Sequence, residues 1–503
     1  MMWFGRILSF SVGFLSLSQE ILWIRLLGFA TSGLPQAFGF VLGSFLIGIA
    51  LGAMAGKRCC ECSKNLTATG GVVLMFAGFI DLVLPWLAIQ ALKMPAPAHL
   101  LGLAALIAAS AFLKSILFPI AHHLGTEASQ GKVGVSVSRV YFANILGSTM
   151  GPLVTGLVVL QILSLQESFV AVGTLTCLVG FVCLVRTLRP LQLLLPSAAL
   201  AGTAALAMPF PLVEHLILRD EPNRGPINFV QQSRYGILHT RADALGGDWV
   251  YGGNAYDGRV NTDLLVDSNG IQRVYLLAAL HPSARNILEI GVGSGSWTAV
   301  LAGMPSMDKL TVVEINPGYE ELVARYAESE AAMAVPGVEL IWSDGRNWLK
   351  EQQGAKFDLV VVNTTFHWRA YSTMLLSRDF MELVRAHLAD SGIYAFNSTG
   401  SHDAFATAQA VFPYVYRFDT FAIAANHELN LDSGTAVRRI TQIALPLDKM
   451  IDASDPRVLA KIQSMVTGFH RYGATDDSVD AEVITDDNMV VEYRHGSRLR
   501  WWK

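Results

Sequence analysis

The stretch ARNILEIGVGSGSW, residues 284–297, decides the fold of the C-terminal half of this chain. Its first half is an apolar run of β-forming residues, and its second half is a glycine-rich turn that leads into a helical pattern. Gly291, Gly293 and Gly295 carry no Cβ atom, so the backbone of this turn can pass close to a ligand. Such a turn after a strand is typical of nucleotide-binding α/β sheets, although G-x-G-x-G alone is a weak signal.

Four more strand patterns follow, and helical patterns such as residues 318–333 separate them. This alternation predicts a doubly wound, Rossmann-like α/β domain with a parallel sheet. Ligands bind such sheets at the carboxyl ends of the strands. The strands lie in KLTVVEINP (309–317), VELIWSDGRNWL (338–349), KFDLVVVNTT (356–365) and GIYAFNST (392–399).

Acidic residues at the strand ends indicate the ligand. Glu314 ends the second strand, 19 residues beyond Gly295, and is suitably placed to accept hydrogen bonds from ribose hydroxyls. Asp344, which ends the third strand, is placed to accept from an adenine amino group. A nucleoside without a pyrophosphate fits these positions better than NAD does, so we expect S-adenosylmethionine. The predicted nucleoside-binding residues are Gln272, Glu289, Gly291, Gly293, Gly295, Glu314, Asp344 and Gly345.

The N-terminal half has a different composition. The chain is 52% hydrophobic and 16% charged, and the apolar excess lies before about residue 210. Seven apolar blocks are long enough to cross a bilayer as helices, and no signal-peptide cleavage site follows the first. We therefore expect a multi-pass α-helical membrane domain. The expected spans are 7–30, 34–56, 70–92, 97–120, 138–163, 167–187 and 190–208.

The charge balance changes at the same point. Residues 1–210 hold 11 Lys and Arg against 5 Asp and Glu, whereas the remainder holds 26 against 36. A net acidic soluble half offers no footprint for nucleic acid. The expected organisation is a transmembrane domain (1–210), a connector (211–226), a small β region (227–282) and the Rossmann-like domain (283–503).

Ionisable and small residues interrupt the apolar blocks. A charge at membrane depth costs several kcal/mol unless it is paired or hydrated, so each such residue is a candidate functional residue. The alternative is structural pairing, for example of Glu20 with Lys114. Glycines spaced four apart, at 48, 52 and 56 and again at 147 and 151, predict close helix packing. The ionisable candidates are Glu20, Arg25, Asp81 and Lys114.

The combined motifs resemble one family. The stretch from 247 to 295, GDWVYGGNAYDGRVNTDLLVDSNGIQRVYLLAALHPSARNILEIGVGSG, resembles the β-hairpin region and first nucleotide-binding motif of spermidine synthases. TVVEINPGYEELVARY, SDGRNWL and FDLVVVN follow in that family's order. GFLSLSQEILWIRLLG, SFLIGIALGAMAGKR, YFANILGSTMGPLVTG and the C-terminal VITDDNMVVEY resemble fused membrane and spermidine-synthase-like proteins. This resemblance, over nearly the whole chain, implies a polyamine aminopropyltransferase-like domain of the S-adenosylmethionine-dependent methyltransferase superfamily. Its co-substrate would be S-adenosylmethionine or decarboxylated S-adenosylmethionine.

Two positions depart from the family pattern. Aminopropyltransferases carry an aspartate within the glycine motif, where this chain has Ser294. They also carry Asp-x-x-Asp after the fourth strand, where this chain has NTTF at 363–366. Those carboxylates hold and deprotonate cationic amines, so their absence argues against a polyamine acceptor.

The stretch NTTFHWR, which starts at Asn363, then supplies the candidate catalytic residues. His367 is suited to act as a general base, and Arg369 to hold a carboxylate or phosphate. In the alternative interpretation, Phe366 and Trp368 pack under the sheet and His367 is a bystander. We expect Thr364 to line the wall. The candidate catalytic residues are Asn363, Thr365, His367 and Arg369.

We therefore expect an integral membrane transferase that acts on a small-molecule or lipid-linked acceptor, associated with the bilayer and able to form a homodimer. No metal is expected, because the cysteines at 59, 60 and 62 lack a second ligand pair. One alternative is a polyamine aminopropyltransferase with a rearranged acceptor site. Another is a transporter or sensor that binds the nucleoside without turnover.

Two arguments about orientation conflict. Basic residues such as Arg6, Lys57 and Arg58 lie on the same side of the predicted spans as the N-terminus. By the positive-inside rule, this side faces the cytoplasm, and the membrane would be a bacterial inner membrane. Seven spans would then put the C-terminal half outside. S-adenosylmethionine is made in the cytosol, so we expect the transferase domain in the cytoplasm. Either the block 190–208 does not cross or the charge rule does not hold here.

Overall fold

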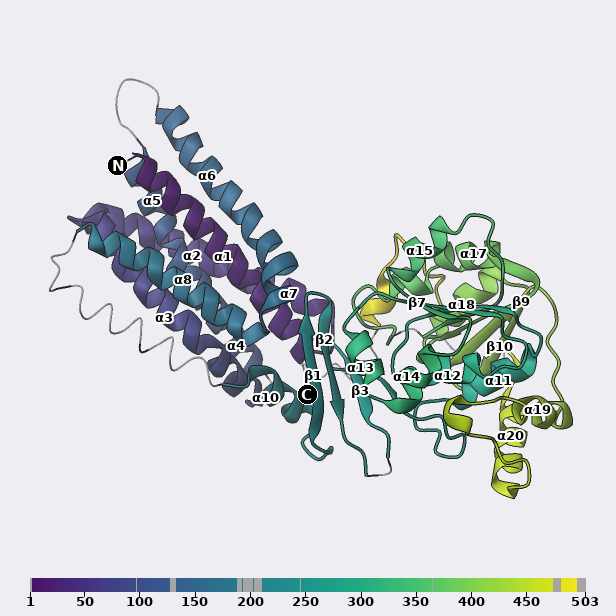
Figure 1. The fold of residues 1–503 in the computed structure, drawn as a ribbon. Helices are drawn as coiled ribbons and strands as arrows, with labels where there is room; N and C mark the ends of the chain where they lie inside the picture. Colours follow the sequence, from purple (N-terminus) through teal and green to yellow (C-terminus); the bar gives the residue numbers. More distant parts are fainter. Residues whose placement is uncertain are drawn as a thin grey trace. The chain divides into compact units, whose positions relative to one another are not determined.

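The computed structural model describes residues 2–95, 97–126, 133–187, 192, 202, 210–244, 246–363, 365–473 and 481–494. These residues form two compact units (Figure 1). The helical unit runs to Asn223, and the α/β unit takes in almost all of the chain from Arg224 onward. The expected fold class, long apolar helices followed by an α/β domain, is confirmed.

Among the residues described, six helices are long and apolar enough to cross a membrane. They coincide with six of the seven expected spans, and the seventh falls almost entirely outside the described residues. Two spans are composite, α4 with α5 and α6 with η1 and α7. The elements are α1 (Met2–Ala30), α2 (Gln36–Cys62), α3 (Leu66–Leu92), α4 (Ala98–Ser115), α5 (Leu117–Gly125), α6 (Val133–Val154), the π-helical η1 (Thr155–Val159), α7 (Leu160–Ile162), α8 (Leu165–Val185) and α10 (Leu212–Asp220).

The glycines spaced four apart lie where helices approach closely, as predicted. A Cβ atom at Gly48 or Gly52 of α2 would overlap backbone carbonyl oxygens of α4. A Cβ atom at Gly147 or Gly151 of α6 would overlap those of α1. Because only glycine permits this separation, the two helix pairs pack backbone against backbone.

Lys114 of α4 pairs with Asp81 of α3. Lys114 Nζ lies 2.6 Å from Asp81 Oδ2, and both side chains are only 1% exposed. Ser110 Oγ donates to Asp81 Oδ1 at 3.2 Å. Glu20 is buried on α1, and Arg25 is half-buried on the same helix. The suggested pairing of Glu20 with Lys114 is therefore wrong, because a nearer carboxylate takes the ammonium group.

Removing one partner of this ion pair should destabilise the protein more than removing both partners. Lys114→Met leaves the Asp81 carboxylate buried and unpaired, which costs about 3–5 kcal/mol. We expect its melting temperature in detergent to fall well below that of the double variant Asp81→Leu/Lys114→Met. Lys57→Met, which removes an exposed partner of Glu61, should change little. Equal melting temperatures for Lys114→Met and Lys57→Met would contradict this role.

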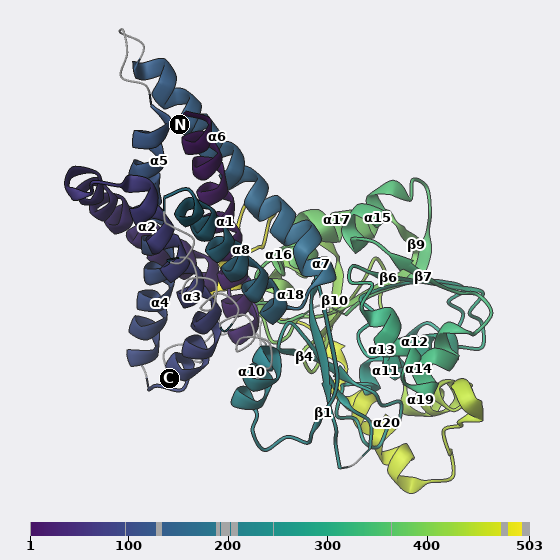
Figure 2. The same cartoon turned by 60° about the vertical axis from the view of Figure 1, so that its left-hand side comes forward.

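The helix α10 lies at the end of the bundle away from the start of α1, as Figures 1 and 2 both show. Leu212 N–H donates to Gln166 Oε1 at 3.3 Å, at the start of α8. Arg219 Nη2 donates to the Ala30 carbonyl oxygen at 2.9 Å, at the end of α1. Since α8 ends at Val185, the residues on either side of the predicted seventh span lie at opposite ends of the bundle.

The α/β unit contains two sheets. The smaller has the order β1-β2-β3-β4, and the larger has the order β12-β10-β11-β9-β8-β5-β6-β7. The strands are β1 (Ile227–Ser233), β2 (Gly236–Arg241), β3 (Trp249–Gly252), β4 (Ala255–Arg259), β5 (Asn286–Ile290), β6 (Lys309–Glu314), β7 (Val338–Trp342), β8 (Phe357–Val362), β9 (Leu388–Asn397), β10 (Tyr414–Phe418), β11 (Phe421–Ala425) and β12 (His470–Arg471).

Five neighbouring strands of the larger sheet, β9-β8-β5-β6-β7, are parallel, as predicted. The strands β11, β10 and β12 add an antiparallel edge beside β9 that the alternating pattern did not predict. Ile287 and Leu288 of β5 belong to separate apolar cores, because successive side chains of a strand point to opposite faces. Both faces are therefore covered by helices (Figure 1).

The helices that cover the first core include α11 (Gln272–Leu280), α12 (Ser296–Ala302), α13 (Tyr319–Ala324), α14 (Ala327–Met333), α19 (Ser433–Ile440) and α20 (Pro456–Gly468). Those that cover the second include α15 (Gly345–Glu351), α16 (Thr373–Leu376), α17 (Arg378–Ala386) and α18 (His402–Val411).

Candidate active site

A cavity of about 260 Å³ lies at the carboxyl end of the parallel strands. Residues after β5, β8 and β9 line it, together with residues of β4 and of the segment that leads into α11. This is the edge at which doubly wound sheets bind their ligands. Its lining includes Asp257, Arg273, Ser294, Asn363, Asn397 and Thr399.

The turn after β5 depends on its glycines. Gly291, Gly293 and Gly295 have positive φ angles of 91°, 51° and 75°, a conformation that favours glycine. A Cβ atom at Gly293 would lie 3.0 Å from the side-chain amide nitrogen of Asn363 and 3.2 Å from the backbone carbonyl oxygen of Asp257. The turn therefore fits between β4 and the end of β8, and its two non-glycine residues line the cavity.

Glu314 holds this turn from the end of β6. Its Oε2 accepts from Val292 N–H at 3.1 Å, and its Oε1 accepts from Asn316 N–H at 2.8 Å. Burial raises the pKa of the Glu314 carboxyl to about 7, although the backbone donors favour the ionised form. Glu314 is thus fixed beside the turn, but it is not among the residues that line the cavity, so its contact with a ribose stays a prediction.

Glu289 is fully buried in β5. Its Oε2 accepts from Thr298 Oγ1 at 2.7 Å, whereas its Oε1 has no hydrogen-bond partner among the described residues. Burial raises the pKa of this carboxyl to about 8. Glu289 does not line the cavity, so a direct contact with the nucleoside stays a prediction.

Three other predicted residues lie near the same edge without lining the cavity. Asp344 is exposed, and its Oδ1 caps α15 by accepting from Asn347 N–H at 2.8 Å. Gly345 lets α15 approach Ile290 closely. Gln272 begins α11, but the next residue, Arg273, lines the cavity instead. The roles of these residues toward a nucleoside stay predictions.

A buried polar cluster adjoins the cavity around Asp257 of β4. Tyr319 donates its hydroxyl to Asp257 Oδ2, and the Arg369 guanidinium adds a nearby positive charge. Arg369 Nη1 also donates to Thr365 Oγ1 at 2.6 Å. Burial raises the pKa of Asp257 and lowers that of Arg369. Asp257 is among the residues that line the cavity, whereas Arg369 is not.

His367 contacts the cavity through one hydroxyl group. Its backbone N–H lies 2.9 Å and its ring Nδ1 lies 2.8 Å from Oγ1 of Thr399, which lines the cavity. The Phe366 and Trp368 rings stack with centroids 5.2 Å apart, and Phe366 lines the cavity. Among the predicted catalytic residues, Asn363 and Thr365 line the cavity directly. The predicted wall residue at 364 falls outside the described residues.

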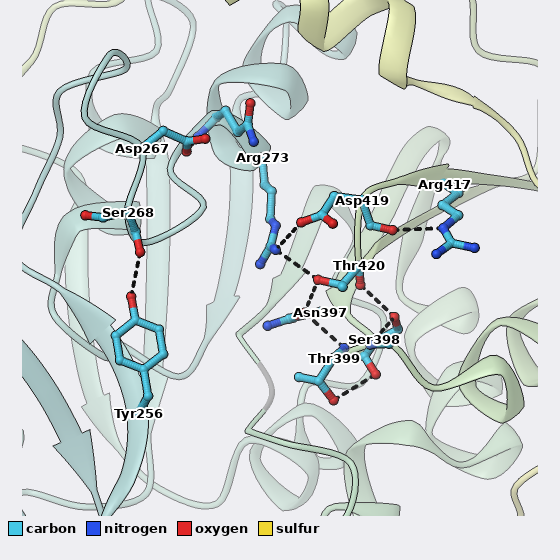
Figure 3. Close-up of polar contacts among 12 residues, drawn as sticks. Tyr256, Asp267, Ser268, Arg273, Asn397, Ser398, Thr399, Arg417, Asp419 and Thr420 are labelled. Carbon is cyan, nitrogen blue, oxygen red and sulfur yellow. Dashed lines mark hydrogen bonds and ion pairs between the residues drawn. The ribbon is translucent and has the colours of Figure 1, made fainter. Parts of the chain in front are cut away.

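A second polar network at the cavity includes residues that the sequence did not mark (Figure 3). Arg273 of α11 donates through Nη2 to Asp419 and Thr420. Thr420 Oγ1 in turn donates to Asn397 Oδ1 at 3.2 Å. Arg273 lies more than 100 positions before the other three residues in the chain, so no local motif could have identified this network. The glycine-rich motif did correctly indicate the edge of the sheet at which they meet.

The α/β unit is similar to known proteins. Residues 274–409 match the model of the spermine/spermidine synthase domain family. The polyamine aminopropyltransferase of Pyrobaculum arsenaticum is 25% identical over 151 residues, or 29% of this chain and 50% of the relative. That of Thermococcus onnurineus is 31% identical over 122 residues, or 24% of this chain and 43% of the relative. The chain thus spans about half the length of these relatives.

Among solved structures, a spermidine synthase in complex with the transition-state analogue AdoDATO aligns with 48% of this chain and 89% of its own. The identity is 15% and the TM-score is 0.36.

The raised pKa of Glu314 predicts pH-dependent binding of the expected co-substrate. Only the ionised carboxylate accepts from both ribose hydroxyls, so affinity should rise as the pH rises through about 7. The Kd for S-adenosylmethionine should be roughly tenfold higher at pH 6 than at pH 8. Calorimetry on the detergent-solubilised chain measures this. Glu314→Gln should bind at least tenfold more weakly at pH 8 and lose the pH dependence; an unchanged Kd would exclude the ribose assignment.

Proposed function

We propose, on the premise that the C-terminal half of this chain is a spermidine-synthase-like domain, that the protein is a transferase with a sulfonium nucleoside as co-substrate. The donor is S-adenosylmethionine or its decarboxylated form. The acceptor is a small or lipid-linked molecule other than a polyamine. The main support is the cavity where the glycine turn meets Asp257, the only carboxylate among its described lining residues.

The acceptor is inferred from the charge of the cavity. A polyamine carries several ammonium groups, and a site that binds one needs carboxylates to balance them. Here the family's three acidic positions hold Ser294, Asn363 and Phe366, which are neutral and line the cavity. The cavity also holds the cationic Arg273. A neutral or anionic acceptor fits this lining better than a polyamine does.

The chemistry is a displacement at carbon. A lone pair of the acceptor forms a bond to a carbon attached to the sulfonium, and the carbon–sulfur bond breaks with its electrons left on sulfur. Alignment of the two molecules supplies much of the rate. The acceptor's proton passes to the Asp257 carboxylate, whose raised pKa makes it a stronger base. Tyr319 and Arg369 hold that carboxylate in place.

His367 is a second candidate base. It would reach the acceptor's proton through the Thr399 hydroxyl, which lies within 2.9 Å of both its ring and its backbone nitrogen. We favour Asp257 because this residue lines the cavity, whereas His367 does not. Asn363 and Thr365 would then position the acceptor by hydrogen bonding from the cavity wall.

The helical unit is proposed to lie in a bacterial inner membrane. Its six long apolar helices support this placement, and the buried pair of Lys114 and Asp81 suits an environment without water. An acceptor dissolved in or attached to the same membrane would be concentrated beside the enzyme.

A polyamine aminopropyltransferase is the second candidate. The similarity to the two relatives favours it, because both are polyamine aminopropyltransferases. It would require an amine acceptor to be held without the three aspartates of the family, with Asp257 as the sole described carboxylate in the cavity lining.

The proton-transfer assignment predicts a large kinetic effect at Asp257. Asp257→Asn should slow label transfer from the donor into membrane extract by about 10² to 10⁴, the usual contribution of a general base. The Kd for the donor should change little. His367→Ala should slow transfer less than Asp257→Asn does. Asp390→Asn, at an exposed position on the far end of β9, serves as the matched control. A larger loss in His367→Ala would make the histidine the base.

Membrane placement and a cytosolic donor together predict the sidedness of the chain. Cys62 is exposed at the end of α2, and its neighbours Cys59 and Cys60 pack against an apolar cluster that includes Leu8 of α1, so it marks the end of the bundle where α1 starts. A membrane-impermeant maleimide should label Cys62 in intact cells. Cysteine introduced at the exposed Ser391, in a variant with serine at 59, 60 and 62, should react only after permeabilisation.

Labelling of both positions in intact cells, or of neither, would contradict the prediction that Cys62 and residue 391 lie on opposite sides of the membrane. The reverse pattern would place the α/β unit outside the cytoplasm and exclude a cytosolic donor. The buried Cys177 and Cys183 should stay unlabelled in every variant.

A further inference from the structure

The guanidinium of Arg273 is held rigidly at the cavity wall (Figure 3). Its Nη2 donates to Asp419 Oδ2 at 2.7 Å and to Thr420 Oγ1 at 2.9 Å. Gly270, with a φ of 64°, lies directly against it, and a Cβ atom there would come within 2.9 Å of Arg273 Cζ. The backbone of Gly270 thus leaves room for the guanidinium, so its position is set before any ligand binds.

The same guanidinium keeps an unsatisfied donor. Arg273 Nε is buried and has no hydrogen-bond partner among the described residues. Buried polar groups are nearly always hydrogen-bonded in native proteins, and each exception needs an explanation. A guanidinium offers five N–H donors in a planar fork that matches a carboxylate. Because Arg273 lines the cavity, a carboxylate on a ligand bound there would lie beside this fork.

The surroundings of Arg273 would tolerate a second carboxylate. The Arg273 side chain is 14% exposed, whereas its partner Asp419 is 56% exposed, so water screens much of the partner's charge. Across the cavity, Ser294 and Asn363 are neutral. The remaining carboxylate, on Asp257, already accepts from Tyr319. Thus none of the family's acidic positions would repel a ligand carboxylate here, because Phe366 at the third position is also uncharged.

We propose that Arg273 binds the α-carboxylate of intact S-adenosylmethionine, so that the donor is S-adenosylmethionine and not its decarboxylated form. This inference rests on the proposed function, because it concerns the same cavity and the same co-substrate. Decarboxylated S-adenosylmethionine lacks the one group that Arg273 is built to hold. The acidic positions of aminopropyltransferases suit an amine-ended donor, and their neutral replacements here suit a donor that ends in a carboxylate.

The choice of donor limits the chemistry to two balanced reactions. If the acceptor's lone pair bonds to the methyl carbon, the sulfur electrons remain on S-adenosylhomocysteine. If it bonds to the amino-acid γ-carbon, the acceptor gains a 3-amino-3-carboxypropyl group and 5′-methylthioadenosine leaves. In either case the acceptor's proton goes to Asp257, and no oxidant or reductant is needed.

Binding of three nucleosides to the detergent-solubilised full chain tests the proposal. The probes are S-adenosylmethionine, its decarboxylated form, and 5′-methylthioadenosine, which has the nucleoside without the amino-acid part. The wild type should bind S-adenosylmethionine at least roughly tenfold more tightly than the decarboxylated form, since hydrogen bonds to charged groups are the stronger ones. Arg273→Gln should abolish that preference and leave the Kd for 5′-methylthioadenosine unchanged.

Two further variants test whether the planar guanidinium of Arg273 is required and whether the effect is specific to this residue. Arg273→Lys keeps the charge but loses the planar fork, so it should retain only part of the preference; it also serves if Arg273→Gln does not fold. Arg417→Gln is the matched control, because Arg417 contacts the same Asp419 through the backbone oxygen but does not line the cavity. It should bind all three probes as the wild type does.

The outcomes separate this inference from the proposed function. If the wild type binds none of the three probes, the proposed function fails. If it binds the decarboxylated form as tightly as S-adenosylmethionine, the transferase proposal stands and the inference about Arg273 is overturned. If Arg273→Gln keeps every Kd but lowers label transfer, the guanidinium holds an anion of the acceptor, which also overturns it.

Discussion

The carboxylate of Glu314 joins the ends of two neighbouring strands, and the geometry of the cavity depends on it. One oxygen accepts from Val292 in the glycine turn after β5, and the other accepts from Asn316 after β6. A carboxylate at this depth would be very costly without such donors, so the turn and the strand end hold each other in place. With the turn held, Ser294 lies at the cavity wall and Gly293 packs against the end of β8.

Each unit contains a buried carboxylate that opposite charge and hydrogen bonds stabilise, although the partners differ. In the helical unit, the Asp81 carboxylate has an ammonium group and a hydroxyl as partners. In the α/β unit, the Asp257 carboxylate has a phenol donor and a nearby guanidinium. Both arrangements offset the desolvation of an ion by opposite charge and hydrogen bonds. The difference is that Asp257 also meets a cavity, which makes it available for chemistry.

The proposed function divides the cavity into a part that would hold the nucleoside and a part where the two substrates would react. Gly291, Gly293 and Glu314 keep the close backbone path and the strand-end acceptor that a nucleoside needs. Around the position where the transferred carbon would lie, neutral Ser294 and Asn363 stand where the resembling family carries aspartates. A change of this kind alters which substrate is tolerated without disturbing the sheet, because the two side chains lie on turns after the strands.

The sequence by itself determined the features that depend on residues close together in the chain. Apolar blocks long enough to cross a membrane, the strand and glycine turn at 284–297, and the acidic end of β6 were all visible as local patterns. Only the tertiary structure decided that Lys114 pairs with Asp81 and that Arg273 faces the cavity. Those contacts depend on which face of a helix or strand meets another element far away in the chain. Hydrophobic periodicity predicts that a face is buried, but it does not specify the partner, because many distant segments share the same period.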